Sequence, residues 1–368
     1  MGSPHETIRF TVDGSDALEQ RIAEDVRKIC DAAVSAAGPG DLTAVILGGG
    51  YGRGEGAVWR EGGQEAVYND YDFFAVTPST SRRRNKRVAA AVRDAGKRLE
   101  SEVGVHVDFG RPLPHSNLPH LPYELMMMEL KMGHIVLHGP SDVLATMPDY
   151  DPKRVPLVEG ARLLMNRCVG LIRSRMLLRE RRPLQTDEYQ FVIRNTQKAM
   201  MAAGDAVLFV KEVYSPSYVR RGKIFEELDL KGIPRGEQLR ERYRESIEFK
   251  LRPRHDLPPG LDLSSWVEQS VSLFGNLFLW FERQRLGEPG MGWDDYMARP
   301  QRLPVKGSLE RLLNLLRNLR ARAMPVCGVR GMFFHPRDHI LKTAPRLLYG
   351  EGDAASEKDF LRLWRLYS

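Results

Sequence analysis

Three aspartates in short apolar segments, Asp70, Asp72 and Asp108, are the residues whose type and spacing point most directly to chemistry. Asp70 and Asp72 stand two apart in an extended segment, so both side chains should point to the same face of a strand. Two neighbouring carboxylates repel each other and should not both stay ionised without a cation. Asp108 stands alone between Val107 and Phe109. Three such acids are what a pair of Mg²⁺ ions needs, since oxygen ligands and substrate phosphates complete its coordination. The competing interpretation is a strand-end acid pair with an unrelated Asp108.

Five glycines between Gly48 and Gly54 directly follow an apolar run, Leu42 to Leu47. Glycine permits a tight turn and lets backbone N–H groups approach an anion closely. A phosphate-binding P-loop needs a lysine where this chain has Glu55, and a carboxylate there would repel phosphate. The P-loop is therefore rejected.

A dinucleotide-binding turn is the second alternative for these glycines. Gly48 and Gly50 supply the first two glycines of that pattern, but Arg53 occupies the third position, where a side chain would keep the helix off the strand. A shifted match through Gly52, Gly54 and Ala57 fits a looser pattern but begins late after the strand. A dinucleotide-binding oxidoreductase thus stays open as an alternative.

The elements that must position these residues follow from hydrophobic periodicity. Residues 1–150 alternate strand and helix patterns and predict a mixed sheet covered by helices, with strands near 42–47, 70–76, 105–109 and 133–139 and helices near 17–33, 82–102 and 123–132. A polar, proline-containing stretch at 147–159 is a plausible linker. Residues 151–368 predict an all-helical second domain, with helices near 163–182, 187–213, 264–286 and 308–323. The fold class is therefore α+β with a helical C-terminal domain.

The last of these helices carries a single apolar stripe. Its leucines recur at steps of three and four residues, the pattern of an amphipathic helix, and they are Leu309, Leu312, Leu313, Leu316 and Leu319.

Taken together, the glycine turn and the three acids resemble the DNA polymerase beta superfamily of nucleotidyltransferases. The resemblance rests on Gly49-Gly50-Tyr51-Gly52-Arg53-Gly54-Glu55, then Asn69-Asp70-Tyr71-Asp72, then Asp108. The turn is most similar to that of the uridylyltransferases that modify the PII signalling protein. The chain is too short for the additional domains of those enzymes, so PII itself is not implied as the substrate. The segment 57–68 is longer than the usual spacing between turn and acids and is expected to form a hairpin.

The resemblance implies a nucleotidyltransferase fold and a Mg²⁺-dependent transfer of a nucleotide from ATP or another nucleoside triphosphate to an acceptor hydroxyl. Asp70 and Asp72 would ligate two metal ions, and Asp108 would ligate the catalytic one and help to deprotonate the acceptor. Gly49 and Gly50 would hold the phosphates, with Arg53 as a charge clamp. Lys198, on a helix similar to those of relatives with helical second domains, would reach the triphosphate.

Other residues are assigned structural roles. Glu55 would tie down the turn or pair with Arg53 and is not expected to be catalytic. Tyr214, Tyr218, Arg220 and Arg221 are expected in a loop, where packing is favoured over contact with a base or the acceptor.

Composition narrows the classes of partner. The chain has 368 residues, a net charge of +7 and three widely spaced cysteines, which do not indicate a disulfide framework or a zinc ribbon. A small molecule or a protein is favoured over RNA as the acceptor. No membrane-spanning segment is expected, and a cytoplasmic location follows by default. The alternative to an enzyme is a degenerate module of the same fold that binds nucleotides or a partner.

Overall fold

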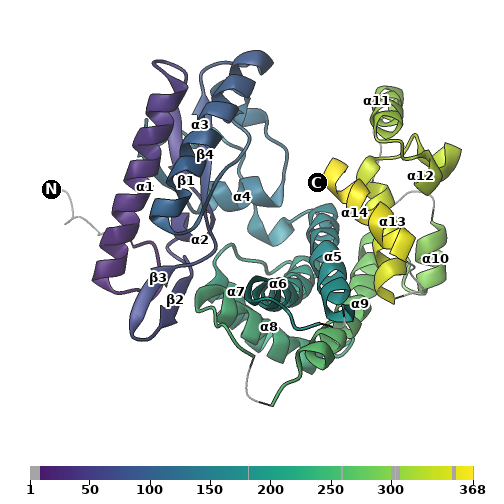
Figure 1. Ribbon diagram of the computed structural model, residues 1–368. Coiled ribbons are helices and arrows are strands. Elements are labelled where there is room, and N and C mark those ends of the chain that lie inside the picture. The colour runs from purple at the N-terminus through teal and green to yellow at the C-terminus, as the bar shows by residue number, and fades with distance from the viewer. Residues whose placement is uncertain are drawn as a thin grey trace. The chain divides into compact units, whose positions relative to one another are not determined.

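The computed structural model describes residues 9–180, 182–257, 260–299, 303, 307–349 and 354–367 (Figure 1). The chain divides into two compact units. The first comprises Met1–Val155 together with two later segments, Val213–Ile224 and Ile247–Arg254. The second comprises Pro156–Glu212, Phe225–Ser246 and His255–Ser368. The returning segments of the first unit were not anticipated by the division at residue 150.

The first unit is built on a mixed sheet. Its strand order is β5 (His106–Phe109), β4 (Asp70–Thr77), β1 (Ala44–Leu47) and β7 (Ile135–His138), and β6 (Leu113–Pro114) also pairs with β4. Strand β1 runs antiparallel to both β4 and β7, whereas β4 and β5 are parallel. The predicted mixed sheet is confirmed.

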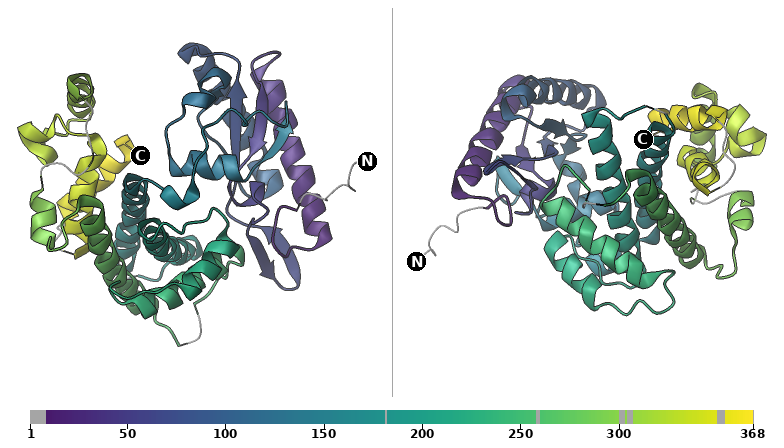
Figure 2. Two further views of the ribbon diagram at one scale, coloured as in Figure 1. Left: turned by 180° about the vertical axis from the view of Figure 1, so that it is seen from behind. Right: turned by 60° about the horizontal axis from the view of Figure 1, so that its bottom comes forward.

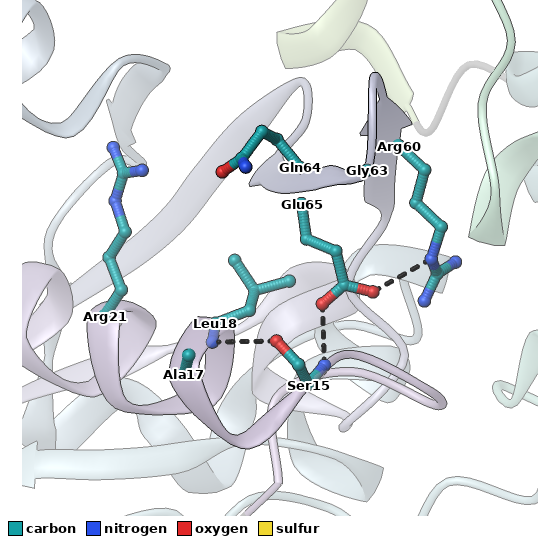
Figure 3. Close-up of a pocket in the computed structure, with 8 residues that line it drawn as sticks. All are labelled: Ser15, Ala17, Leu18, Arg21, Arg60, Gly63, Gln64 and Glu65. Carbon is teal, nitrogen blue, oxygen red and sulfur yellow. Dashed lines mark hydrogen bonds and ion pairs between the residues drawn. The ribbon is translucent and has the colours of Figure 1, made fainter.

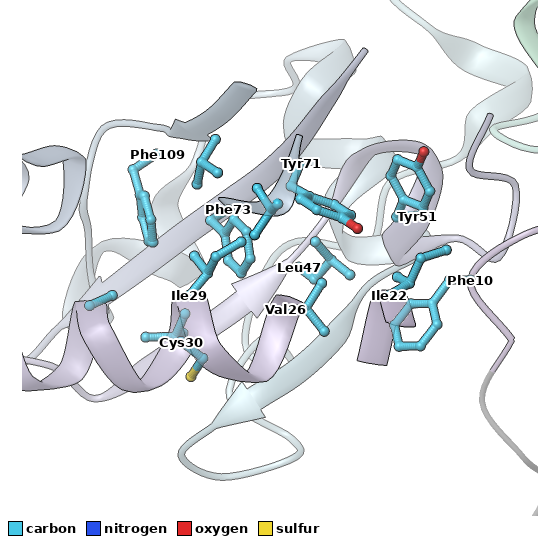
Figure 4. Close-up of a cluster of buried hydrophobic side chains, with 14 of the residues drawn as sticks. Phe10, Ile22, Val26, Ile29, Cys30, Leu47, Tyr51, Tyr71, Phe73 and Phe109 are labelled. Atoms are coloured by element: carbon cyan, nitrogen blue, oxygen red, sulfur yellow. The ribbon is translucent and has the colours of Figure 1, made fainter. Parts of the chain in front are cut away.

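Two long helices, α1 (Asp16–Ala37) and α3 (Arg82–Val103), lie side by side and pack against one face of this sheet (Figure 1). Ile22 and Ile29 of α1 meet Tyr71 and Phe73 of β4 and Phe109 of β5, and all five are at most 1% exposed (Figure 4). Because side chains alternate along a strand, burial of Tyr71 and Phe73 directs the intervening residues of β4 to the opposite face. The burial of Tyr71 and Phe73 therefore determines the face to which Asp70 and Asp72 point.

The connections complete the first unit. A four-residue helix, α2 (Gly49–Gly52), follows β1, and an antiparallel hairpin of β2 (Val58–Glu61) and β3 (Gln64–Val67) confirms the hairpin predicted at 57–68. Further along come the 3-10 helix η1 (His115–His120), α4 (Leu125–Met132) and η2 (Pro152–Arg154).

The described elements of the second unit are all helical, as predicted. They are α5 (Leu157–Arg179), α6 (Thr186–Val210), parts of α7 (Tyr218–Glu227) and α8 (Gly236–Leu251), α9 (Leu263–Leu286), α10 (Trp293–Ala298), α11 (Gly307–Arg320), α12 (Met324–Gly331), α13 (Pro336–Tyr349) and α14 (Ala354–Tyr367). Helices α5, α6 and α9 pack against one another (Figure 2). Gly160 allows their close approach, because a Cβ there would lie 2.5 Å from the Phe281 ring. Within the described ranges, no helix combines the length and apolar character that a membrane span requires.

Candidate functional site

The structure brings the three predicted aspartates to one face of the sheet. Asp72 of β4 is the direct register partner of Asp108 of β5, and Asp70 is the partner of His106. Paired positions on neighbouring strands project to the same side, and Asp70 lies two residues from Asp72, so all three carboxylates share the face opposite α1 and α3. Asp70 and Asp72 are half-buried. Asp108 is exposed, although its neighbours Val107 and Phe109 are buried, because β5 lies at the edge of the sheet.

The carboxylates influence one another electrostatically. Burial, together with the neighbouring charges of Asp70 and Asp108, raises the pKa of Asp72 to about 6 against the opposing effect of Lys250 and Arg53. Like charges disfavour ionisation, and nearby cations favour it. Burial is the largest of these causes, and the charges act in both directions.

The fit of this face to metal ions depends on donor chemistry. Three carboxylates are hard oxygen donors of the kind that Mg²⁺ prefers. In the part of the chain that the structure describes, however, no group of three or more His, Cys, Asp or Glu side chains is gathered closely enough to form a preformed metal site. Mg²⁺ in nucleotide enzymes is commonly held by one or two carboxylates and by substrate phosphates, and does not need an all-protein cage. The donor set fits Mg²⁺ in kind, and the ready-made cluster is absent from the described residues.

The glycine turn packs directly against Asp72. Gly49 has a φ of +61°, and a Cβ there would lie 2.0 Å from Oδ2 of Asp72. The backbone N–H of Gly48 donates a 2.8 Å hydrogen bond to the Asp72 carbonyl, and the N–H of Glu55 donates one of 2.8 Å to the Gly50 carbonyl, which closes the turn. Glycine is thus required at position 49 both by conformation and by the carboxylate beside it. The phosphate contacts assigned to Gly49 and Gly50 remain a prediction.

Arg53, which was predicted to act as a charge clamp, lies in a buried cluster. Its side chain is only 7% exposed, and its guanidinium lies 3.6 Å from Oε2 of Glu129 and 5.1 Å from the centre of the Tyr218 ring. Arg221, which lies 3.5 Å from Oε1 of Glu129, places its guanidinium 4.3 Å from the same ring. Tyr214 and Arg221 are further joined by a hydrogen bond, and Tyr214 donates another to Glu129. The position of Arg53 is thus set by Glu129 and Tyr218.

Lys250 completes the group of cations around Tyr218. Its ammonium lies 5.3 Å from the centre of that ring. Aromatic faces attract cations, so the tyrosine holds Arg53, Arg221 and Lys250 near one another. The influence of Lys250 and Arg53 on the pKa of Asp72 shows that these two cations act on the acidic face. This part of the unit therefore offers carboxylates suited to metal ions, and beside them positive side chains suited to an anionic ligand.

Glu55 connects the glycine turn to α7. Its carboxylate accepts hydrogen bonds from Ser217 Oγ at 2.6 Å, from the Tyr218 backbone N–H at 2.7 Å and from that of Val219 at 3.1 Å. These are the free N–H groups at the start of a helix, which a carboxylate satisfies well. Glu55 therefore fixes the helix that carries Tyr218 and Arg221. These residues and Arg220 were expected in a loop, but they form the first turn of α7.

The sequence missed two residues of this site, Glu129 and Lys250. Neither belongs to a motif, and Lys250 lies in the last turn of α8, a position where basic residues are common for reasons of helix stability. Lys198, in contrast, was predicted to reach the triphosphate. It is half-buried on α6 in the second unit, and its contact with a nucleotide stays a prediction.

A separate cavity of about 460 Å³ lies between the start of α1 and the hairpin (Figure 3). The carboxylate of Glu65 occupies its charged side, where it accepts a 2.7 Å hydrogen bond from the Ser15 N–H and a 2.9 Å bond from Nε of Arg60. None of the three aspartates lines it. The carboxylate of Glu65 is thus satisfied within the fold.

Topology also bears on the dinucleotide alternative. A dinucleotide-binding unit consists of parallel strands joined by a full crossover helix that begins at the glycine turn. Here β1 is antiparallel to both of its neighbours, and α2 has only four residues. The turn therefore does not open a unit of that kind.

Comparison with known proteins adds no relative. No protein-family model matches this sequence, and the comparisons with curated proteins and with solved structures likewise give no match.

Proposed function

We propose that this protein is a nucleotidyltransferase that moves a nucleoside monophosphate from a nucleoside triphosphate to an acceptor hydroxyl and releases pyrophosphate. One observation carries the proposal. Asp72 and Asp108 are direct register partners on parallel strands, and Asp70 shares their face beside a glycine turn that packs against Asp72. The function rests on this arrangement together with the resemblance of the same residues to the polymerase beta superfamily.

In the proposed reaction the acceptor oxygen bonds to the α-phosphorus, and the bond from that phosphorus to the bridging β-phosphate oxygen breaks. Bound Mg²⁺, held by Asp70, Asp72 and Asp108, would supply neutralisation of phosphate charge. The exposed carboxylate of Asp108 is available to accept the proton of the acceptor hydroxyl.

The cations near Tyr218 would bind the anionic substrate. Lys250 is a flexible point charge suited to phosphate oxygens, and Arg53 is held in place by Glu129. The conformation of Gly49 keeps the turn free of side chains, so that backbone groups can approach the phosphates. A small molecule or a protein remains the favoured class of acceptor.

A nucleotide-binding module without catalysis is the second candidate. The surroundings of Asp72 distinguish the enzyme from the binding module. A binder of anions gains nothing from a desolvated carboxylate beside two further aspartates, whereas a metal-dependent enzyme needs it.

Incubation with each α-³²P-labelled nucleoside triphosphate, Mg²⁺ and a cell extract tests the proposal. We expect label transfer with at least one nucleotide. Asp72→Asn and Asp108→Asn should each reduce the rate by about a hundredfold to a thousandfold, as removal of one stabilising group in an active site typically does. Asp94→Asn, on the exposed side of α3, is the matched control and should retain the wild-type rate.

Two results would contradict the proposal. Full label transfer by Asp72→Asn would remove the assigned mechanism. Saturable nucleotide binding without transfer from any triphosphate would favour the binding module.

A further inference from the structure

Helix α11 has its apolar and polar faces reversed relative to an ordinary surface helix. An amphipathic helix normally turns its leucines to the core. In α11 five leucines are 42% to 72% exposed, whereas Asn314 and Asn318 are fully buried. The exposed stripe consists of Leu309, Leu312, Leu313, Leu316 and Leu319.

A buried asparagine, Asn318, holds the helix in this orientation. Nδ2 of Asn318 donates hydrogen bonds to the carbonyls of Met332 at 2.9 Å and Phe334 at 3.1 Å. Rotating the helix to bury the leucines would break both bonds and expose the asparagine. The exposed stripe is therefore a property of the folded unit.

The spacing of the stripe suits a second helix. Leu309, Leu312, Leu316 and Leu319 follow one another at steps of three, four and three residues, which are the a and d positions of a heptad repeat. Side chains at such positions pack between those of a neighbouring helix. In the same heptad frame, Arg320, the last residue of α11, falls at an e position, one of the positions whose charges select the partner helix.

A basic cavity adjoins the C-terminal end of this stripe. It has a volume of about 540 Å³ and is lined by residues from the end of α11, the turn that follows it, and α14. Five of its seven lining residues are cations, Arg320, Arg322, Lys358, Arg362 and Arg365, and none of the seven is acidic. This charge favours an acidic occupant.

We propose that α11 is a docking site for an acidic amphipathic helix of a partner protein. The apolar stripe of that helix would pack on the leucines, and its flanking Asp and Glu residues would lie over the cavity. A second copy of this chain would bring the same five cations and so does not complement the charge. A membrane surface offers no partner for heptad spacing.

The test uses two designed three-heptad peptides and the full-length protein. Both peptides carry Leu at a and d; one has Glu and the other Lys at e and g. We expect the Glu peptide to bind at least about tenfold more tightly, a difference of about 1.4 kcal/mol. Anisotropy of labelled peptide measures both affinities.

Variants separate the two contributions. Leu312→Asp with Leu316→Asp should abolish binding, and Arg322→Glu with Arg365→Glu should reverse the preference between the peptides. Leu261→Asp, at another exposed leucine, is the control and should bind as the wild type does. The substituted leucines are exposed, so circular dichroism and thermal unfolding should match the wild type.

Three outcomes would overturn the proposal. One is equal binding of the two peptides, or no binding. Another is self-association in sedimentation that disappears in the Leu312→Asp, Leu316→Asp variant, which would assign the stripe to a second copy. The third is binding to phosphatidylserine vesicles without binding to either peptide, which would assign it to a membrane surface.

Discussion

Glu55 and Asp72 both lie against the glycine turn of the first unit, but their carboxylates have opposite surroundings. Glu55 is 7% exposed and accepts hydrogen bonds from a hydroxyl and two backbone N–H groups of the α7 start. Asp72 has two aspartates among its nearest charges and is opposed by Lys250 and Arg53. The comparison shows that burial alone does not identify a functional acid. A carboxylate that the fold fully satisfies is structural, and one that the fold leaves with like charges is a candidate for chemistry.

The largest effect should come from removing the satisfied acid. Glu55→Ala leaves three donors without their acceptor and should lower the free energy of unfolding by about 3 to 4 kcal/mol. Urea unfolding followed by circular dichroism measures it. Glu55→Gln keeps an acceptor oxygen and should lose less, so equal losses in the two variants would contradict the capping role.

The turn between the two acids should be the next most sensitive position. Gly49→Ala places a Cβ 2.0 Å from Oδ2 of Asp72 at a φ of +61°. We expect a loss of about 3 kcal/mol, from left-handed strain together with steric overlap. Gly62→Ala is the matched control, since its φ is +57° with nothing within 4 Å, and it should cost about 1 kcal/mol. Equal losses would show that Asp72 does not constrain the turn.

Replacing Asp72 by a neutral residue should stabilise the protein, which is the opposite of the effect expected at Glu55. The pKa of Asp72 is about 6 in the folded protein against an ordinary value of 3.8, so the folded state binds the proton more tightly. This contribution to stability is present below pH 4 and is lost as the pH rises through 6. Asp72→Asn should therefore raise the free energy of unfolding at pH 7, without Mg²⁺, by about 2 kcal/mol.

That gain has a defined pH window. It should disappear at pH values below 4, where the wild-type carboxyl is protonated in both states. Urea unfolding in EDTA at both pH values measures it. A destabilised Asp72→Asn variant at pH 7 would place Asp72 in the same structural class as Glu55.

Lys250→Gln should give the smallest effect. Removing a cation that lowers the pKa of Asp72 should raise this pKa above 6. A ¹³C titration of the Asp72 carboxyl by NMR measures the shift. Lys223→Gln, at an exposed lysine of α7, serves as the control and should leave the titration unchanged.

The local sequence pattern was sufficient to predict much of the secondary structure of the first unit. The apolar residues of β1, β4 and β5 and the alternation of Tyr71 and Phe73 with Asp70 and Asp72 predict both the strands and the shared face of the acids. These features depend on neighbours in the sequence, which is why periodicity detects them.

Long-range contacts could not be predicted in this way. The ion pair of Arg53 with Glu129, and the return of Lys250 to the first unit, depend on how distant segments pack. In helix α11 the leucine stripe was predicted from the sequence, but its orientation was not. Asn318 sets that orientation through hydrogen bonds to the carbonyls of Met332 and Phe334, which the periodicity of the sequence does not reveal.

The return of Ile247–Arg254 to the first unit also has a consequence for the order of synthesis. A ribosome completes the three acidic positions when Asp108 emerges, but Lys250 emerges only after much of the helical part has been made. Until then the nascent sheet carries its carboxylates without the lysine that opposes them. On the proposed function, with Lys250 as a substrate-binding cation, transfer activity should first appear in nascent chains that extend past Arg254.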